Sequence, residues 1–293
     1  MMRLIPNTQL VLAGISARMG DFLANAGGGS SGAQSIIPVI PSWRLFLLSL
    51  GLLLLVAWII HRLLSKQKFS LDRTPARDNN LNLLHLLFIV FLMLVGMSVA
   101  GSFEENSKWR FIVGALGQIV IAAAVIYIAA QSFRGRLKRG LGVTLRRWKS
   151  DLARGVIGYL AIAPVCFVLL QLMAMIPDLQ DTHPLLEQMD MSKSPFLTFL
   201  FVFVAVVVAP LSEELLFRGM IQSMIRKYMK NAWIAIIVAS TLFAMLHPLW
   251  SWPALFVLAV AMGYNYERCG RLMPSILIHS LFNAVACIGW LTM

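Results

Sequence analysis

Two adjacent acids, Glu213 and Glu214, stand directly after the long apolar run from Pro195 to Ser212. A charged side chain at the centre of a bilayer costs about 2.5–3.5 kcal/mol on insertion scales, so such groups usually face a polar cavity and act there. The simpler interpretation is a helix end, from which both acids reach the membrane surface beside Arg218. The pair is therefore either an intramembrane acid–base group or a solvated helix end.

The spacing gives the two acids different roles. Glu214 and Arg218 are four residues apart, which places them on one helical face where they can pair. Glu213 points about 100° away from Glu214 and is left comparatively unpaired. One acid can therefore be structural while the other is available as a base.

Histidines in two later apolar runs fall at a depth that matches these acids. Glu213 lies 17 residues before Lys230, and His247 lies 17 residues after it. A helical hairpin that turns near Lys230 places both at one depth. His279 lies about nine residues from the next predicted turn, or roughly 13 Å along a helix, and shares a helical face with Asn283. A histidine and an asparagine there are, taken alone, more often hydrogen-bond partners between helices.

Together these groups suit the hydrolysis of an acyl bond. A carboxylate in low dielectric has a raised proton affinity, which suits a general base acting on water, and a histidine opposite can share that water. A second histidine and an amide can donate hydrogen bonds to a carbonyl oxygen as it gains charge. No serine lies in a GxSxG pattern and no cysteine accompanies these residues, so a covalent nucleophile is not indicated.

Three other interpretations stay open. His247, His279 and a glutamate form an acceptable set of catalytic zinc ligands, although no HExxH motif is present. A non-catalytic membrane protein, such as an immunity factor or a scaffold, could keep the same residues. A transporter could use them as a proton relay, but the two halves of the chain show no internal repeat.

The composition requires a membrane to position these residues. Hydrophobic residues make up 59% of the chain, charged residues 13%, and the mean hydropathy is +0.77, whereas a soluble domain is about half apolar and a quarter charged. A crossing helix needs about 20 apolar residues. The sequence predicts an all-α fold, a polytopic membrane helix bundle of about eight transmembrane helices. The expected spans are Arg44–Leu64, Leu81–Gly101, Phe111–Ala130, Gly155–Ile176, Pro195–Leu216, Asn231–His247, Trp252–Tyr266 and Pro274–Leu291.

The chain is expected to divide into three parts. Residues 1–43 form an amphipathic or flexible tail, residues 44–176 form four accessory transmembrane helices, and residues 195–293 form the four-helix core with the candidate site. In the accessory helices, polar side chains are expected to be hydrogen-bond partners between helices: Gln118, Tyr127, Tyr159 and Gln171. Trp250 and Trp252 are expected to be anchors at the membrane interface, the alternative being that the short connection there dips into the cavity.

The net charge of +12 is divided unequally between the two faces of this bundle. Four segments fall on one side in an eight-helix count and hold 19 of the 25 Lys and Arg residues: His61–Asn80, Gln131–Arg154, Arg218–Lys230 and Glu267–Arg271. The loop Pro177–Ser194 on the other side is acidic. By the positive-inside rule, the basic loops face the cytoplasm and both termini lie outside. Membrane lipid is therefore an expected partner, and nucleic acid is not.

Three motifs resemble those of the CPBP intramembrane proteases, a family that includes the type II CAAX prenyl endopeptidase and bacteriocin-processing enzymes. Glu213–Arg218 matches EExxxR, Phe243–His247 matches FxxxH, and His279–Asn283 matches HxxxN. Each motif is weak alone, but all three in this order on hydrophobic helices are specific. The resemblance covers roughly Pro195–Val285.

The resemblance implies a glutamic-type intramembrane endopeptidase in the bacterial cell membrane, with its site open toward the cytoplasm. By position, Glu213 would activate water with His247 assisting, and His279 with Asn283 would form the oxyanion site. The Glu214–Arg218 pair would brace the helix. No cofactor is expected, a divalent metal such as zinc being the alternative. The expected substrate is a peptide or a membrane-protein segment, lipidated or not.

Overall fold

The computed structural model describes residues 42–65, 71, 77–104, 107–134, 136–176 and 194–291. The tail expected over residues 1–43 lies outside the described residues except for its last two, which begin the first helix. The acidic loop expected over Pro177–Ser194 also lies outside them, apart from Ser194.

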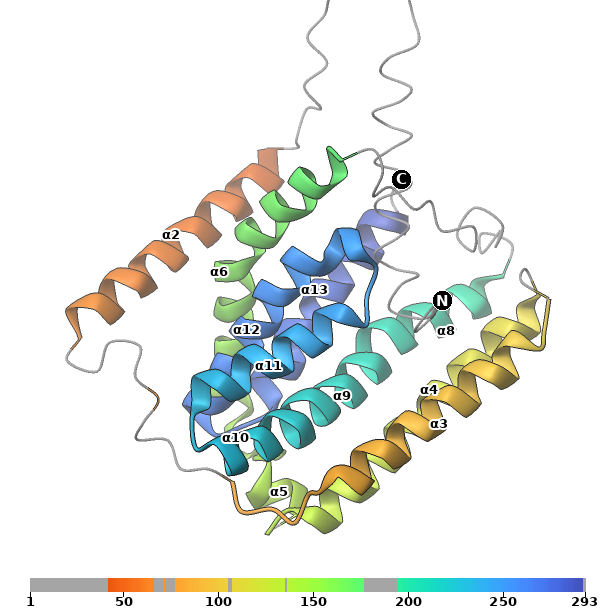
Figure 1. The fold of residues 1–293 in the computed structure, drawn as a ribbon. Coiled ribbons are helices and arrows are strands. Elements are labelled where there is room, and N and C mark those ends of the chain that lie inside the picture. Colours follow the sequence, from red (N-terminus) through yellow and green to blue (C-terminus); the bar gives the residue numbers. More distant parts are fainter. Residues whose placement is uncertain are drawn as a thin grey trace, which may run out of the picture.

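The described chain forms a bundle of helices (Figure 1). Among the described residues, five helices are long and apolar enough to cross a membrane, and two further apolar helices are shorter. The predicted all-α, polytopic membrane bundle is therefore confirmed. The main helices of the bundle are α2 (Ser42–Leu64), α3 (Leu83–Gly101), α4 (Lys108–Ser132), α6 (Trp148–Ala174), the continuous helix Pro195–Met229, α11 (Ala232–Met245), α12 (Trp252–Cys269) and α13 (Met273–Leu291).

The continuous helix is longer than the predicted span Pro195–Leu216, because it runs on through the amphipathic stretch to Met229. It consists of α8 (Pro195–Phe203), α9 (Ala209–Glu214) and α10 (Ser223–Met229), joined by two π-helical segments. The Ser194 side chain caps its start by accepting from the Leu197 amide. Lys230 then adopts a left-handed conformation with φ of 54°, and Asn231 caps the start of α11. The tight turn predicted near Lys230 is confirmed.

This helix lies between two groups of neighbours. On one side α4 packs against α9 and both π-helical segments, and α3 packs on α4. On the other side lie α11 and α13, which both contact α12. Helix α6 contacts α12 and α13, and α2 packs against α6 (Figure 1). The acids predicted to do chemistry therefore sit on a helix enclosed on two sides.

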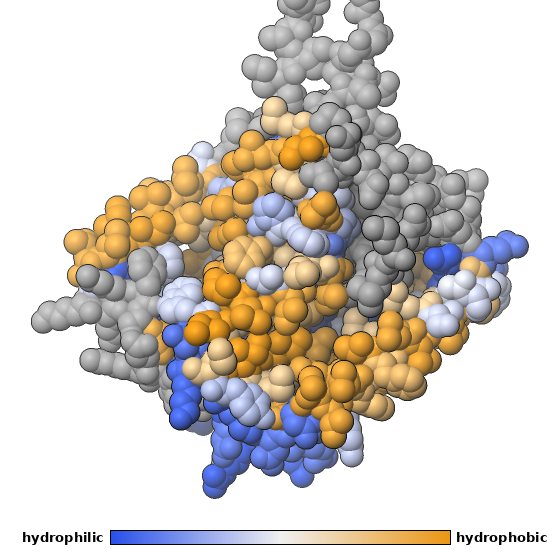
Figure 2. All heavy atoms as spheres, in the orientation of Figure 1, coloured by the Kyte–Doolittle hydropathy of each residue, from blue (hydrophilic) through white to orange (hydrophobic). Residues whose placement is uncertain are grey.

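The surface separates into apolar and charged regions. Hydrophobic side chains cover much of the visible face over the helices, and hydrophilic ones gather at the end where α5 (Arg136–Gly140) and α10 lie (Figure 2). Large exposed apolar side chains on α2, α3 and α4 suit contact with lipid tails. That the hydrophilic end faces the cytoplasm stays a prediction.

A proline and a glycine explain how α2 approaches α6. Pro164, inside α6, has no amide hydrogen to give to the carbonyl of Leu160, four residues earlier. Gly51 of α2 lies against that carbonyl, and a Cβ atom at position 51 would come within 2.1 Å of the Leu160 oxygen. Only glycine allows this close approach between the two helices.

We predict that Gly51→Ala destabilises the folded protein by about 1–3 kcal/mol, because the added methyl group would overlap a backbone oxygen that cannot move aside. The matched control is Gly96→Ala in α3, where a Cβ atom would meet nothing within 4 Å. The control should be neutral or stabilise by up to about 1 kcal/mol through helix propensity. Thermal unfolding in detergent measures both, and equal unfolding temperatures would contradict the account.

Candidate active site

The candidate site lies on a short α-helical segment between two π-helical ones. The segment α9, which ends at Glu214, is preceded by the π-helical Val204–Val208 and followed by the π-helical Leu215–Gln222. Single π turns inside α-helices are rare and often occur at functional sites, because each turn re-aims the side chains that follow it. The π-helical segments on either side therefore set the direction in which the two acids point.

The first π-helical segment leaves one carbonyl without a donor in its own helix. The amide of Ala209 donates to Val204, five residues earlier. The next residue, Pro210, has no amide hydrogen, so Ala205 finds no partner at the fourth or fifth residue after it. Asn283 of α13 donates its side-chain Nδ2 to the Ala205 carbonyl oxygen at 2.8 Å. The amide side chain therefore completes the backbone hydrogen bonding of the helix that carries the acids.

Glu214 is fully buried and occupied by two partners. Its Oε1 atom lies 3.1 Å from Nη1 of Arg218 and 3.2 Å from Nδ1 of His279. Arg218 is also fully buried and donates to the Ala259 carbonyl of α12 at 3.2 Å. The predicted pairing of Glu214 with Arg218 is confirmed, and the pair ties the continuous helix to α12 and α13.

Glu213 is half-buried, and its carboxylate is differently placed. Its side chain is 13% exposed, and its Oε2 atom lies 3.9 Å from Nε2 of His279. That oxygen accepts no hydrogen bond from any residue that the structure describes. His279 thus stands between the two acids, with one ring nitrogen at each of them. Glu213 is the member of the pair that is left available.

His247 has one ring nitrogen committed and one open. Its Nδ1 atom lies 2.8 Å from the Phe243 carbonyl oxygen. A carbonyl can only accept, so Nδ1 carries the hydrogen and Nε2 of the neutral ring keeps its lone pair. Trp252 donates its indole N–H to the His247 carbonyl at 2.7 Å. The prediction that Trp250 is an interfacial anchor is wrong, since its side chain is buried, whereas for the half-buried Trp252 it stays a prediction.

Phe243 packs at the centre of these groups. Its fully buried ring lies 4.8 Å from the ring of His247 and, edge to face, 5.5 Å from that of His279. The Arg218 guanidinium lies 4.9 Å from its centroid, and Phe217 packs edge to face at 5.1 Å. One aromatic ring therefore sets the positions of both histidines and of the arginine that holds Glu214.

A small pocket joins Glu213 to His247. Its cavity of ≈ 30 Å³ is enough for about one or two water molecules. Two helices outside the core contribute to its wall, Met93 from α3 and Gln118 with Ile121 from α4. The remaining described lining residues are Ser212, Leu216, Phe217 and Leu246. The matched depth predicted for Glu213 and His247 thus brings both to one cavity.

Gln118 is a polar residue of this pocket, and its position beside Ser212 could not be predicted from the sequence. It donates from Nε2 to the Ser212 hydroxyl at 3.1 Å, as an interhelical partner should. The Ser212 hydroxyl gives its own proton to the Ala209 carbonyl at 3.1 Å, so it can only accept from Gln118. This fixes the orientation of the amide and leaves its Oε1 atom as an acceptor. The indication in the sequence was a glutamine within an otherwise apolar span.

The structure thus gathers the predicted residues in two connected groups. Glu213 and His247 line the pocket, while His279 contacts both acids from α13. Asn283 lies one helical turn from His279 and bonds the backbone at Ala205. Among the described residues, no three His, Cys, Asp or Glu side chains form a group that could hold a metal ion.

Comparison with known proteins finds a family model that matches part of the chain. Residues 195–285 match the family model described as Type II CAAX prenyl endopeptidase Rce1-like. Over these residues the chain is similar to that family. The recognition made from the three motifs is therefore confirmed over the same range that the motifs predicted.

Two curated relatives of the chain come from Lactococcus lactis subsp. lactis (strain IL1403). The UPF0177 protein YxdF is 34% identical over 79 residues, which are 26% of this chain and 42% of that protein. The UPF0177 protein YbdI is 30% identical over 96 residues, 32% of this chain and 51% of that protein. The chain thus spans about half the length of these relatives. No solved structure matches it significantly.

The Rce1-like segment contains both acids, both histidines, Phe243, Pro210 and Asn283. Helices α3 and α4, which complete the pocket with Met93 and Gln118, lie outside the matched range. The pocket wall is therefore built partly by the Rce1-like segment and partly by the N-terminal helices of this chain.

We predict that Asn283 and Pro210 are energetically coupled. Asn283→Ala should destabilise the protein by about 1–3 kcal/mol, because it leaves the buried Ala205 carbonyl without a donor. In a Pro210→Ala background the helix regains an amide hydrogen at position 210, so the same change should be less destabilising, with a coupling of about 0.5–3 kcal/mol.

Thermal unfolding of the two single variants and the double variant measures this coupling. Asn265→Ala is the matched control, because Asn265 also donates to a backbone carbonyl, that of Ala261 within α12. The control should be additive with Pro210→Ala. If the effects of Asn283→Ala and Pro210→Ala were additive as well, the Ala205 carbonyl would not be the group that couples these two residues.

Proposed function

We propose that this chain is an intramembrane endopeptidase of glutamic type, which cleaves a peptide bond in a membrane-associated protein or peptide. One observation carries the proposal: of the two adjacent acids, the buried Glu214 is held through Oε1 by Arg218 and His279, whereas the half-buried Glu213 lines the pocket and its Oε2 lies 3.9 Å from His279. The Rce1-like match supports the same class of activity.

The proposed reaction begins with a water molecule in the pocket between Glu213 and His247. The water donates one proton to the Glu213 carboxylate and a hydrogen bond to Nε2 of His247 or Oε1 of Gln118. Its oxygen attacks the peptide carbonyl, and the proton held by Glu213 passes to the leaving amine. The carbon–nitrogen bond then breaks, which gives a carboxylic acid and an amine, returns Glu213 to its carboxylate form and needs no covalent enzyme intermediate.

The carbonyl oxygen gains negative charge in this step and needs donors. His279 already gives Nδ1–H to Glu214, so its Nε2 can donate only when the ring carries a proton on both nitrogens. Asn283 uses one of its two amide hydrogens on Ala205 and keeps a second. We therefore propose that His279 stabilises the oxyanion, and that Asn283 both positions the helix and offers its remaining N–H.

The wall of the pocket indicates what kind of substrate fits. Met93 and Ile121 form an apolar side, and they stand on helices whose outer faces carry large exposed hydrophobic side chains. A peptide that reaches the acids along α3 and α4 would bring apolar residues or an attached lipid. We also propose that the basic end of the bundle faces the cytoplasm, in the cell membrane of a bacterium.

We predict that Glu213→Gln abolishes cleavage, with a loss of at least about 100-fold, because the amide keeps the shape of the side chain but cannot accept the proton. The protein should still insert and unfold near the wild-type temperature, since Oε2 of Glu213 lies 3.9 Å from Nε2 of His279, beyond hydrogen-bonding distance. The readout is the set of new peptide termini in membranes that carry the wild type but not the variant.

The control is Glu214→Gln, which makes an equally small change at the adjacent residue. It should lower the unfolding temperature as well as activity, because it leaves Arg218 buried without a counter-charge. A Glu213→Gln protein that keeps the full cellular effect and the same termini would show a non-catalytic immunity or scaffold protein instead.

We predict that cleavage survives an excess of a zinc chelator with less than a twofold loss. The nitrogen Nδ1 of His247 is engaged by a carbonyl, and Glu214 is engaged by Arg218, so these atoms would have to release their partners to bind a metal. The measurement is turnover after dialysis against the chelator. A loss that added zinc restores would favour the metal-dependent alternative.

A further inference from the structure

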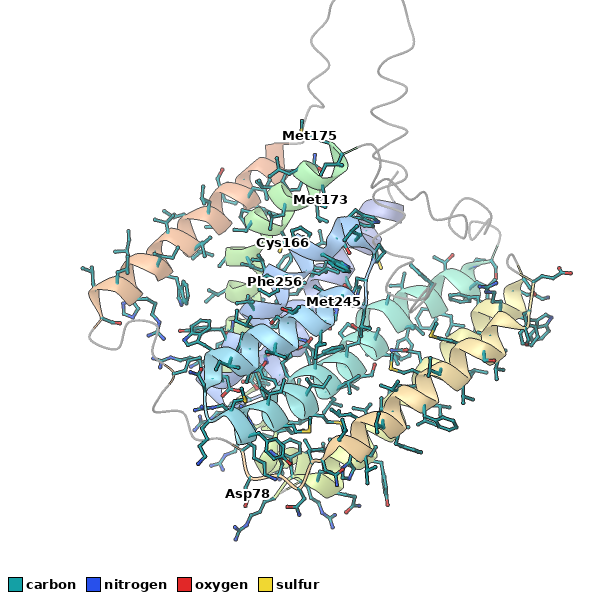
Figure 3. All side chains as sticks on the ribbon, in the orientation of Figure 1. Asp78, Cys166, Met173, Met175, Met245 and Phe256 are labelled. Carbon is teal, nitrogen blue, oxygen red and sulfur yellow. The ribbon has the colours of Figure 1, made fainter. Side chains whose placement is uncertain are left out.

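A second pocket lies at the hydrophilic end of the molecule. Its cavity of ≈ 420 Å³ is lined by Arg77, Asp78, Asn79, Arg226, Lys227 and Lys230, and is called the basic pocket below. Asp78 lies at this end, near α5 and α10 (Figure 3). Arg226 follows Glu213 by thirteen residues, or roughly 20 Å along a helix. The basic pocket is therefore separate from the candidate active site.

Hydrogen bonds hold the walls of the basic pocket in place. Asn80 donates its amide to the Ser132 carbonyl at 2.8 Å, and the Asn79 side chain donates to the Arg77 carbonyl at 2.9 Å. Lys227 donates from Nζ to the Asn79 carbonyl at 2.7 Å, which joins α10 to the segment before α3. One backbone bond and two bonds from side chains to backbone carbonyls thus hold the segment before α3 in place.

Among the described residues, the lining of the basic pocket is predominantly basic. Four of the six lining residues are basic and one is acidic. The acid, Asp78, is paired with the exposed Arg134 at 3.4 Å, and Glu267 lies 3.7 Å from Arg77. A backbone carbonyl orients Lys227 and brings no net charge. A predominantly basic lining of this kind favours an anion with several oxygens.

Apolar side chains beside the pocket indicate that the anion has a hydrophobic part. Tyr228 and Met229 are exposed between two lining lysines, and Leu83 and Leu84 are exposed at the start of α3. A cavity of this size is also in the range that holds a small molecule. We propose that the basic pocket binds the phosphate-bearing headgroup of an anionic phospholipid, whose acyl chains lie along the apolar starts of α3 and α11.

The test measures lipid binding and needs no cleavage, so its failure is distinct from a failure of the proposed protease. The full chain in neutral detergent is titrated with dioctanoyl phosphatidylglycerol, dioctanoyl phosphatidylcholine and inorganic phosphate, and bound lipid is counted by native mass spectrometry. One phosphatidylglycerol should bind with at least tenfold preference over phosphatidylcholine, and 10 mM phosphate should not displace it.

The variant Lys227→Gln with Lys230→Asn should weaken phosphatidylglycerol binding by about thirtyfold, since each lysine beside a lipid phosphate counts for about tenfold or less. The matched control, Lys138→Gln with Lys149→Gln, removes the same charge at exposed positions outside the pocket and should change binding less than twofold. Should the double variant fail to fold, Lys230→Asn alone should weaken binding about fivefold.

Three outcomes would overturn the proposal. Equal binding of phosphatidylcholine would show that the pocket does not distinguish lipid headgroups by their net charge. Equal losses in the variant and its control would show a diffuse surface attraction. Displacement by inorganic phosphate at the concentration of the lipid would make the ligand a free phosphate rather than a lipid.

Discussion

The ion pair between Glu214 and Arg218 is the interaction on which the site depends. Both side chains are fully buried, at 3.1 Å, inside a chain whose surroundings are apolar. Removing two charges from water costs several kcal/mol for each, and this is offset only when each charge also finds further partners. Glu214 has His279, and Arg218 has the Ala259 carbonyl and the face of Phe243. The pair therefore fixes the continuous helix against α11, α12 and α13 at once, and by doing so it presents Glu213 to the pocket.

Two prolines show how the bundle uses backbone groups that a helix cannot satisfy. Inside a bilayer no solvent is available for a released carbonyl, so a neighbouring helix must approach it or donate to it. Pro164 releases the Leu160 carbonyl, and Gly51 of α2 lies against it. Pro210 releases the Ala205 carbonyl through the π-helical turn before it, and Asn283 donates to it. The first device holds an accessory helix, and the second holds the helix with the acids.

Much of the fold could be predicted because hydrophobic length and turn position are local properties. The turn at Lys230 and the pairing of Glu214 with Arg218 follow from counting along one helix, and so does the shared depth of Glu213 and His247. The π-helical segments could not be predicted, because a hydrophobic run such as Val204–Val208 is equally compatible with an α-helix and a π-helix. The partner of Asn283 was also out of reach, since it depends on which carbonyl of another helix lacks a donor. The bond from Trp252 was out of reach for the same reason, because its indole meets the His247 carbonyl only through the course of the short connection.

The account's central claim is that the buried pair of Glu214 and Arg218 acts as one unit that leaves Glu213 available. A double-mutant cycle with Glu214→Gln and Arg218→Gln, read by thermal unfolding in detergent, tests it most directly. Each single change should destabilise the protein by about 3–5 kcal/mol, because it strands a buried charge, and the double change should cost far less than their sum. Additive losses, or single losses of only a few tenths of a kcal/mol, would show that the two charges do not depend on each other and would contradict the account.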